Sequence, residues 1–270
     1  NLVQLGEGKY QKRIQAALTS NTSLLGVETA GNKRLTKMML EDAGIPVPKG
    51  TVIRKLKSAI EDAQWLNYPV TIKPHDGHHG KGVTTNITHE GELVEAFERA
   101  KEMSNKIIVE QHLTGNDYRM LVVGGKFVAA AKRAPAAVVG DGQHTIAELI
   151  DIENQNPDRG YGHENVMTRL KVSSVTEHLL EKSDYGMDTV LNEGETFNLE
   201  LTANLSTGGS AEDVTDRVHK ANKFMAVRIA KILDLDIAGV DVRAPTISEP
   251  IAPVGGAGIE VNAAPGLRMH

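Results

Sequence analysis

Lys73 and the glycines that follow it form the first group of residues with the types and spacing for chemistry. Lys73 ends the apolar run that begins at Val70, and the segment from His75 to Val83 contains three glycines. A lysine held at a strand end, beside backbone amides that no Cβ atom shields, can bind phosphate oxygens. The pattern indicates a phosphate site, and the alternative is a solvated glycine turn with a surface lysine.

Two acids and an amide on apolar segments near the C-terminus form the second group. Asp241 lies within residues 239–242, and Glu260 and Asn262 alternate within residues 259–262. Side chains alternate along a strand, so Glu260 and Asn262 share one face, and a neighbouring strand could bring Asp241 beside them. Mg²⁺ prefers such a set of oxygen ligands, with its other positions left to water and phosphate. The alternative is that each acid points to solvent from an edge strand.

An apolar segment that turns polar is the third group. It runs from Ile107 to Leu113 and is followed by Asp117 and Arg119. An edge strand here could offer backbone groups to adenine, with Asp117 accepting ribose hydroxyls and Arg119 reaching a phosphate or a carboxylate. The alternative is an ordinary strand end and turn.

Other classes of site are disfavoured by the sequence. Cysteine is absent, which excludes disulfides, thiolate zinc sites, iron–sulfur clusters and a cysteine nucleophile. His78 and His79 have no second cluster of metal ligands, so we do not expect a zinc site. Walker-type, Rossmann-type and serine-hydrolase motifs are also missing from the sequence.

Composition narrows the class of partner and the compartment. The 270 residues carry a net charge of −5 and only 4% aromatic residues, so nucleic acid is not expected as a partner. Neither a signal-like start nor an apolar run of about 18 residues is present, so no membrane association is expected. The lack of cysteine fits a reducing cytoplasm. Since the first residue is Asn1, we expect these residues to belong to a longer chain.

Helices and strands must hold these candidate residues in place. Apolar spacing with capping residues predicts helices, and apolar runs bounded by turn residues predict strands. We expect helices over residues 32–43, 58–66, 88–101, 145–150 and 214–233. Asn32 is the expected cap of the first helix, whose apolar positions include Leu35 and Met38, and Thr145 with Glu148 is the expected capping box of the fourth. Met225 and Ile229 lie on the expected buried stripe of the last helix. We expect strands over residues 70–73, 107–111, 120–123, 127–131, 237–242 and 258–261.

The order of these elements predicts the fold class. The pair Gly124-Gly125 between two apolar runs indicates a hairpin. Because strands and helices do not alternate as βαβ units, an antiparallel α+β fold is favoured over a doubly wound sheet. The segment of about 141–196 is rich in Asn, Pro and Gly, so we expect a mobile flap on the substrate side rather than a continuous buried element.

Taken in order, these motifs resemble those of the ATP-grasp ligases. The resemblance is carried by Asn32-Lys33, Ile72-Lys73-Pro74 with its glycine loop, Val109-Glu110-Gln111, Asp117, Asp241 and Glu260-Val261-Asn262. A narrower likeness, to family members that lengthen an aspartate polymer, is carried by Gln4-Leu5-Gly6, Gln11 to Gln15, Lys73 to Val83, Gly162-His163-Glu164 and Glu260 to His270.

The resemblance implies an ATP-grasp fold in which two α+β lobes clamp ATP. Residues 1–31 would be a lead-in segment, and residues 32–112 would form the N-terminal lobe with the glycine loop. Residues 113–270 would form the C-terminal lobe, with the flap of about 141–196 inserted in it.

The resemblance also implies roles for individual residues, with ATP and Mg²⁺ as ligands. The lysines would contact phosphates, residues 110–113 would hold adenine, and Asp117 would hold ribose. Nucleotide-binding residues are implied at Lys33, Lys73, His79, Gly80, Lys81, Gly82, Glu110, Gln111, His112, Leu113 and Asp117. Metal ligands are implied at Asp241, Glu260 and Asn262. Substrate-binding residues are implied at Arg119, Arg133, Arg169, Gly208 and Gly209, and catalytic residues at Lys73, Arg119 and Asn204.

The implied activity is the ATP-dependent joining of a carboxylate to an amine. A peptide C-terminal carboxylate would be phosphorylated, and an amino acid, aspartate, would then displace phosphate from the acyl phosphate. The implied partners are an amino acid and an aspartate-rich peptide or polymer acceptor, and the full-length protein is expected to be a homo-oligomer. Two alternatives stay open: a ligase of the glutathione-synthetase or D-alanine-ligase type, and a nucleotide-binding domain without turnover.

Overall fold

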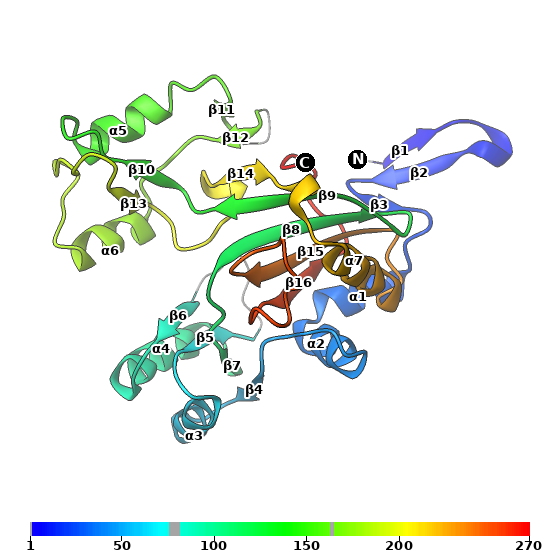
Figure 1. Cartoon of the computed structure of the whole chain (residues 1–270), viewed down its shortest axis with the longest axis horizontal. Coiled ribbons are helices and arrows are strands. Elements are labelled where there is room, and N and C mark those ends of the chain that lie inside the picture. The colour runs from blue at the N-terminus through cyan, green and yellow to red at the C-terminus, as the bar shows by residue number, and fades with distance from the viewer. Residues whose placement is uncertain (1, 76–81, 163–164) are drawn as a thin grey trace. The chain divides into compact units, whose positions relative to one another are not determined.

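The computed structural model describes residues 2–75, 82–162 and 165–270, which form two compact units (Figure 1). Unit 1 comprises Asn1–Gly115, Met120–Val128 and Asp216–Pro265, and unit 2 comprises Asn116–Arg119, Ala129–Thr215 and Gly266–His270. Helices and mainly antiparallel strands occur in both units, so the α+β class predicted from the sequence is confirmed.

Unit 1 begins with a small antiparallel sheet and two short helices. These elements are β1 (Leu2–Leu5), β2 (Lys12–Gln15), β3 (Leu18–Thr19), α1 (Leu24–Gly31) and α2 (Lys33–Asp42). The side chain of Asn32 accepts a hydrogen bond from the backbone amide of Leu35 at the start of α2. This bond satisfies one of the amides that a helix start leaves without a partner, so the predicted cap is confirmed.

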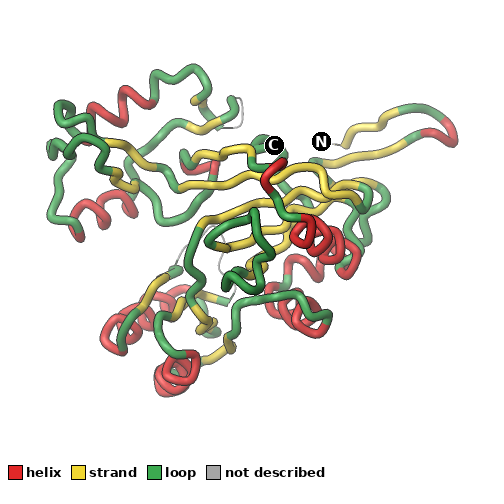
Figure 2. Tube along the Cα trace, in the orientation of Figure 1, coloured by secondary structure: helices red, strands yellow, loops and turns green. Residues whose placement is uncertain are grey.

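Among the described residues, the next part of unit 1 is a four-stranded sheet with helices packed against it. Its elements are β4 (Gly50–Ile53), α3 (Leu56–Leu66), β5 (Val70–Pro74), β6 (Thr84–Ile87), α4 (Glu90–Met103) and β7 (Ile107–Gln111), with strand order β4-β7-β5-β6. Figure 2 shows α3 and α4 as red coils beside these strands. Ile72 and Val109 pack with Leu93 and Phe97 of α4 in one apolar cluster. The other sheet face is therefore left for polar side chains.

A second sheet carries the pair of strands with the predicted metal ligands. Its strands are β8 (Asn116–Val123), β9 (Lys126–Ala134), β14 (Ser210–Asp213), β15 (Ile237–Ala244) and β16 (Ala257–Asn262), in the order β14-β9-β8-β15-β16 among the described residues. Gly124 and Gly125 both have positive φ, at 57° and 71°, and join β8 to β9. The predicted glycine hairpin is therefore confirmed.

The helix predicted over residues 214–233 is shorter in the structure. α7 spans Lys220–Ile232, and a separate 3₁₀ turn occupies Thr215–Arg217. The carboxylate of Asp213 accepts hydrogen bonds from the amide and the hydroxyl of Thr215, a local turn that competes with helix formation. The buried stripe contains Met225 and Ile229, as predicted.

Unit 2 contains the segment expected to be a flap. Its remaining elements are β10 (Ala137–Val139), α5 (Ile146–Glu153), β11 (Arg159–Gly160), β12 (Met167–Thr168), α6 (Ser174–Lys182), β13 (Thr196–Asn198) and a 3₁₀ helix (Leu205–Thr207). The capping box of Thr145 and Glu148 is present, as predicted. Leu149, Leu170 and Leu180 are buried in one apolar cluster, so the segment contributes buried side chains, and its role as a flap stays a prediction. The residues of this cluster are far apart in the sequence and come into contact only in the folded chain, so no local pattern predicts them.

Two smaller differences from the sequence predictions are local. α3 begins at Leu56 after Lys55, two residues before the expected start at 58, and no side chain caps it. α6 was not expected, although Ser173 and Thr176 form a capping box for it.

In the described part of the chain, no helix is both long and apolar enough to cross a membrane.

Candidate active site

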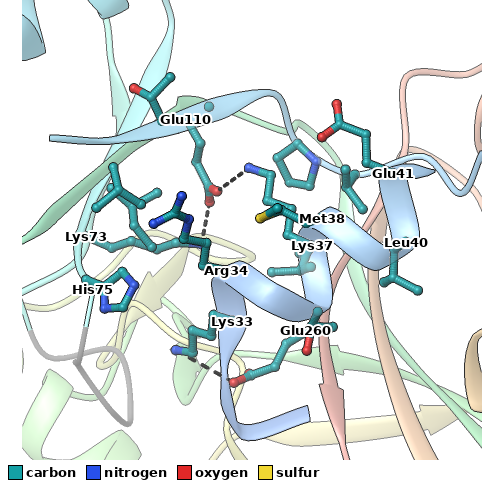
Figure 3. Close-up of a pocket in the computed structure, with 18 of the residues that line it drawn as sticks. Lys33, Arg34, Lys37, Met38, Leu40, Glu41, Lys73, His75, Glu110 and Glu260 are labelled. Carbon is teal, nitrogen blue, oxygen red and sulfur yellow. Dashed lines mark hydrogen bonds and ion pairs between the residues drawn. The ribbon is translucent and has the colours of Figure 1, made fainter. Parts of the chain in front are cut away.

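A pocket of about 560 Å³ in unit 1 gathers several of the predicted nucleotide-binding residues. Its walls come from α2, β4, β5, β7 and β16, and Figure 3 labels several of the charged side chains that line it, among them Lys73, Glu110 and Glu260. Six of the lining residues are cations and three are acids: Lys33, Arg34, Lys37, Arg54, Lys73 and Lys106, with Glu41, Glu110 and Glu260. An excess of cations in a concave site favours a polyanion such as a triphosphate.

Helix α2 brings two lysines into this pocket. Lys33 and Lys37 are four residues apart, so they lie on the same face of the helix. The Nζ atom of Lys33 is 3.7 Å from Oε1 of Glu260, and the Nζ atom of Lys37 is 3.4 Å from Oε2 of Glu110 (Figure 3). Lys37 is absent from the sequence prediction, although its spacing from Lys33 was a signal that could have found it.

Glu110 lies between two lysines. The register pairs it with Thr71, which places its side chain on the same sheet face as Lys73. Its Oε1 accepts a hydrogen bond of 2.5 Å from Nζ of Lys73, and its Oε2 faces Nζ of Lys37. Glu110 is only 6% exposed, so this pairing supplies the partners that a buried carboxylate needs.

Burial and neighbouring charges both change the pKa of Lys37. Burial lowers the pKa of Lys37 below its ordinary value of 10.5, and the nearby Glu110 carboxylate opposes that shift. The neighbouring Lys73 cation adds to the lowering. Burial therefore disfavours the charged form of Lys37, and its acid partner Glu110 favours it.

Lys73 is part of this network rather than an exposed residue. Its side chain is 16% exposed and bonded to Glu110, so the alternative of a solvated surface lysine is wrong. Of the loop residues predicted to cover phosphate, His79, Gly80 and Lys81 lie outside the described residues. Gly82 is described and partly buried, and the phosphate role of the loop stays a prediction.

The predicted metal ligands meet on one face of β15 and β16. Asp241 lies directly opposite Glu260 in the register, and Gly239 lies opposite Asn262, so all three polar side chains share a face. The Nδ2 atom of Asn262 is 3.5 Å from Oδ2 of Asp241. Asp241 is 5% exposed, so the alternative in which it points to solvent is wrong.

The segment predicted to hold adenine is paired on both sides. β7 lies between β4 and β5, so the expected edge strand is an interior strand. The amides of Gln111 and His112 donate to the carbonyls of Lys49 and Pro69. Leu113 is buried. An adenine contact by residues 110–113 stays a prediction, and these two amides are already bonded.

The ring of His112 also has partners within unit 1. Its Nδ1 accepts a hydrogen bond of 3.3 Å from the amide of Asn86 and lies 3.2 Å from the hydroxyl of Thr71. Burial lowers the pKa of His112 below its ordinary 6.5, and the charge of Arg243 adds to this. The ring is therefore neutral at physiological pH.

In unit 2, two residues predicted for different ligands bind each other. Asp117 was assigned to ribose and Arg133 to a substrate carboxylate. The Oδ1 atom of Asp117 accepts a hydrogen bond of 2.8 Å from Nε of Arg133 and a second bond from its Nη2. Arg119 is two residues from Asp117 on β8, so the two side chains share a face of the strand.

The asparagine and glycine loop of unit 2 forms a tight turn. Asn204 accepts hydrogen bonds from the amide and the hydroxyl of Ser206 and so caps the short 3₁₀ helix. Gly208 follows with φ of +94°, and a Cβ atom there would lie 2.9 Å from Leu170 Cδ2. A Cβ atom at Gly209 would lie 2.7 Å from the carbonyl oxygen of Ala134. The turn therefore requires both glycines.

Arg169 follows β12 in the segment predicted to contact the acceptor. Its guanidinium lies 5.3 Å from the ring centroid of Tyr161, a cation–π contact. Its backbone amide donates to Gly160. The contact with Tyr161 was not predicted, and neither was the buried Arg159, which bonds to Gly208.

Comparison of the sequence with known proteins relates the chain to ligases. The family model described as D-ala D-ala ligase C-terminus matches residues 39–183. The chain is 51% identical over 274 residues to a cyanophycin synthetase of Crocosphaera subtropica, covering 100% of this chain and 31% of that protein. The chain therefore spans about a third of the length of these curated relatives.

Comparison of the structures gives the fold. A bifunctional glutathione synthetase from Pasteurella multocida has a TM-score of 0.71 and 30% identity, covering 100% of this chain and 37% of that chain. The ATP-grasp ligase PsnB, in complex with a precursor variant, Mg and ADP, has a TM-score of 0.53 and 15% identity, covering 92% and 55%. The predicted ATP-grasp fold is confirmed, as is the narrower likeness, which is to cyanophycin synthetase. Since the family model matches more than half of the chain, this chain belongs to the D-ala D-ala ligase C-terminus family.

Proposed function

We propose that this chain is the ATP-dependent ligase domain of an enzyme that extends the cyanophycin backbone by adding aspartate to a peptide C-terminal carboxylate. About half of its residues are identical to those of named cyanophycin synthetases, which supports this choice. The proposed partners are a free amino acid and an aspartate-rich acceptor. We further propose that the domain acts in the cytoplasm, within a homo-oligomer of the full-length protein.

The ion pair between Lys33 and Glu260 is the structural observation that supports the ATP-dependent part of this proposal. It joins a lysine expected to contact phosphate with an acid expected to bind metal, and both line the same pocket. A metal-bound triphosphate needs cations and oxygen ligands side by side. The more buried pair of Lys73 and Glu110 lines the same cavity, so the charges of the pocket form a group rather than a single surface salt bridge.

The residues present fit Mg²⁺ as the metal. Within the described ranges, no cluster of three or more His, Cys, Asp and Glu side chains is arranged for a metal ion. Asp241 and Glu260 lie opposite each other on one face of β15 and β16, and Asn262 is on the same face, so their oxygen atoms would supply the protein ligands. Few protein oxygens, with water and phosphate in the other positions, are typical of Mg²⁺.

The chain's own residues would then bind and orient the reactants. ATP supplies the phosphoryl group that activates the carboxylate as an acyl phosphate for attack by the amine. Lys33 and Lys73 would neutralise charge on the phosphates, because positioning and electrostatic stabilisation account for most of the catalysis of phosphoryl transfer. The arginines Arg119, Arg133 and Arg169 would bind substrate carboxylates, and Asn204 with Gly208 and Gly209 would border the acceptor.

Release of ADP by the natural protein that carries this domain tests the proposal. We expect release to require both aspartate and an aspartate-rich peptide with a free C-terminal carboxylate. Release driven by D-alanine alone, or by a γ-glutamyl dipeptide with glycine, would instead identify one of the other ligase types. Nucleotide binding without release under any of these conditions would indicate a non-catalytic domain.

Calorimetry tests the phosphate role of Lys73 separately from turnover. Lys73→Ala should weaken binding of a non-hydrolysable ATP analogue, because one of the pocket cations is lost. Lys57→Ala, an exposed lysine on α3, is the matched control and should bind as the wild type does. An unchanged dissociation constant in Lys73→Ala would remove this lysine from the nucleotide site.

A further inference from the structure

Arg159 in unit 2 is a buried arginine to which the proposed function gives no role. Its residue exposure is 9%, and its guanidinium bonds to three separate segments. Nε donates to Glu153 at the end of α5 over 3.2 Å. Nη1 donates to the carbonyl of Thr168 over 2.9 Å and to the carbonyl of Gly208 over 3.0 Å.

Arg159 makes more hydrogen bonds than neutralisation of its charge requires. A buried guanidinium needs an acid nearby, which Glu153 supplies. The two remaining bonds go to backbone carbonyls of β12 and of the glycine turn, which carry no net charge. The guanidinium presents several donors in fixed directions in one plane, which suits it to hold three such acceptors in a defined geometry.

The two carbonyls belong to the parts of unit 2 assigned to the acceptor. Thr168 directly precedes Arg169, and Gly208 is the residue that needs positive φ in the glycine turn. Local bonds within the turn include that from the amide of Gly209 to the carbonyl of Asn204, and the turn leads into β14, whose first residue Ser210 pairs with Ala134 of β9. Arg159 therefore joins this turn to the strand that leads to Arg169 through hydrogen bonds to both.

We propose that Arg159 is a positioning residue, which fixes the Gly208–Gly209 turn relative to Arg169 and so sets the affinity for the peptide acceptor. The inference rests on the proposed function, because it takes Arg169 and the two glycines as acceptor contacts. Arg159 itself touches neither substrate. Its effect reaches the acceptor through the carbonyls of Thr168 and Gly208.

Steady-state kinetics of the natural protein test this role. Arg159→Met should raise KM for the aspartate-rich peptide about tenfold, because the charged hydrogen bonds that order the turn within the protein are lost, and leave KM for ATP unchanged. Arg159→Lys keeps the charge but loses the fork, so it should recover part of the acceptor affinity. Lys182→Met, an exposed lysine at the end of α6, should change neither constant. Equal rises in both KM values, or a lower Tm with unchanged kinetics, would reduce Arg159 to a structural residue.

Hydrogen exchange gives a readout that does not depend on the reaction. In Arg159→Met, and to a smaller degree in Arg159→Lys, amides of residues 204–210 should exchange faster, while those of the α4 control helix keep their rates. Unchanged exchange at residues 204–210 would overturn the proposal even in an active enzyme. Faster exchange there in a protein without aspartate-dependent ADP release would support the role of Arg159 in holding the turn and reject the proposed function alone.

Discussion

The carboxylate of Asp117 accepts hydrogen bonds from both Nε and Nη2 of Arg133. The side chains are 22% and 10% exposed, so the pair is largely shielded from water. Two donors on one carboxylate give a charge-assisted contact with defined geometry. Sequence reasoning assigned the two residues to ribose and to a substrate carboxylate, and either role requires that a ligand compete with this pair.

A double-mutant cycle measures how strongly the pair is coupled. Arg133→Met should lower the free energy of unfolding by about 1–3 kcal/mol, because it leaves a partly buried carboxylate with fewer donors. Adding Asp117→Asn should cost less in that background than in the wild type. The exposed pair of Lys57 and Glu61 is the control and should show coupling of at most about 0.5 kcal/mol. Additive losses for Asp117 and Arg133 in urea denaturation would contradict the coupling.

Glu110→Gln tests the buried network of the pocket. The substitution leaves Lys37 and Lys73 facing each other without the shared acid, so the free energy of unfolding should fall by about 1–3 kcal/mol. Tripolyphosphate should then raise Tm more in the variant than in the wild type, because phosphate oxygens replace the lost carboxylate.

An exposed acid separates this effect from a general loss of charge. Glu98→Gln on α4 removes a carboxylate from the surface and should leave both the unfolding energy and the response to tripolyphosphate unchanged. A Glu110→Gln protein as stable as the wild type, or one that gains no more from tripolyphosphate, would contradict the proposed network.

Local signals predict where α2 lies but not which of its faces is used. The Asn32 cap and the helical spacing are properties of neighbouring residues, and both are confirmed. Leu35 and Met38 nevertheless stay 40% and 48% exposed, while Thr36 is buried. Which face of α2 is buried depends on partners distant in sequence. The apolar positions alone therefore do not predict that Lys37 lines the pocket.

Strand pairing limits the prediction of the site in the same way. Residues 107–111 were predicted with the bounds of β7, because an apolar run is a local feature. Its central place depends on β4, more than fifty residues earlier, and no local pattern contains that pairing. The shared face of Glu260 and Asn262 follows from alternation alone, whereas Asp241 joins them only through the register of β15.

Asp241→Asn tests the metal assignment. Mg²⁺ should strengthen binding of a non-hydrolysable ATP analogue by the wild type. The variant should lose at least the roughly tenfold in metal affinity that even outer-sphere substitutions cause. Asp151→Asn on α5, an exposed residue, is the matched control. Calorimetry with and without Mg²⁺ makes the comparison, and equal Mg²⁺ dependence in the wild type and Asp241→Asn would show that the metal binds elsewhere.

The turn before α5 predicts a pH dependence. A hydrogen bond to the Asp141 side chain raises the pKa of His144 above its ordinary 6.5. Because the folded-state pKa is the higher one, the stabilisation is fully present below pH 6.5 and is lost as pH rises through the raised value. NMR titration should therefore give His144 a midpoint above 6.5 in the wild type and close to 6.5 in Asp141→Asn. The same midpoint in both proteins would show that the pair does not form.

Arg169→Lys tests whether the segment around β12 recognises the acceptor. Lysine keeps the positive charge but loses the planar fork that binds a carboxylate through two parallel bonds, so KM for the aspartate-rich peptide should rise while KM for ATP stays nearly unchanged.

The contact of Arg169 with Tyr161 adds a second variant to this test. Tyr161→Leu removes the ring that lies 5.3 Å from the guanidinium and should produce a smaller rise in the same constant, because the arginine remains but is less constrained. Arg217→Lys, an arginine in the 3₁₀ turn before α7, controls for the general effect of the exchange. Equal effects of Arg169→Lys on both substrates, or none on either, would remove Arg169 from the acceptor site.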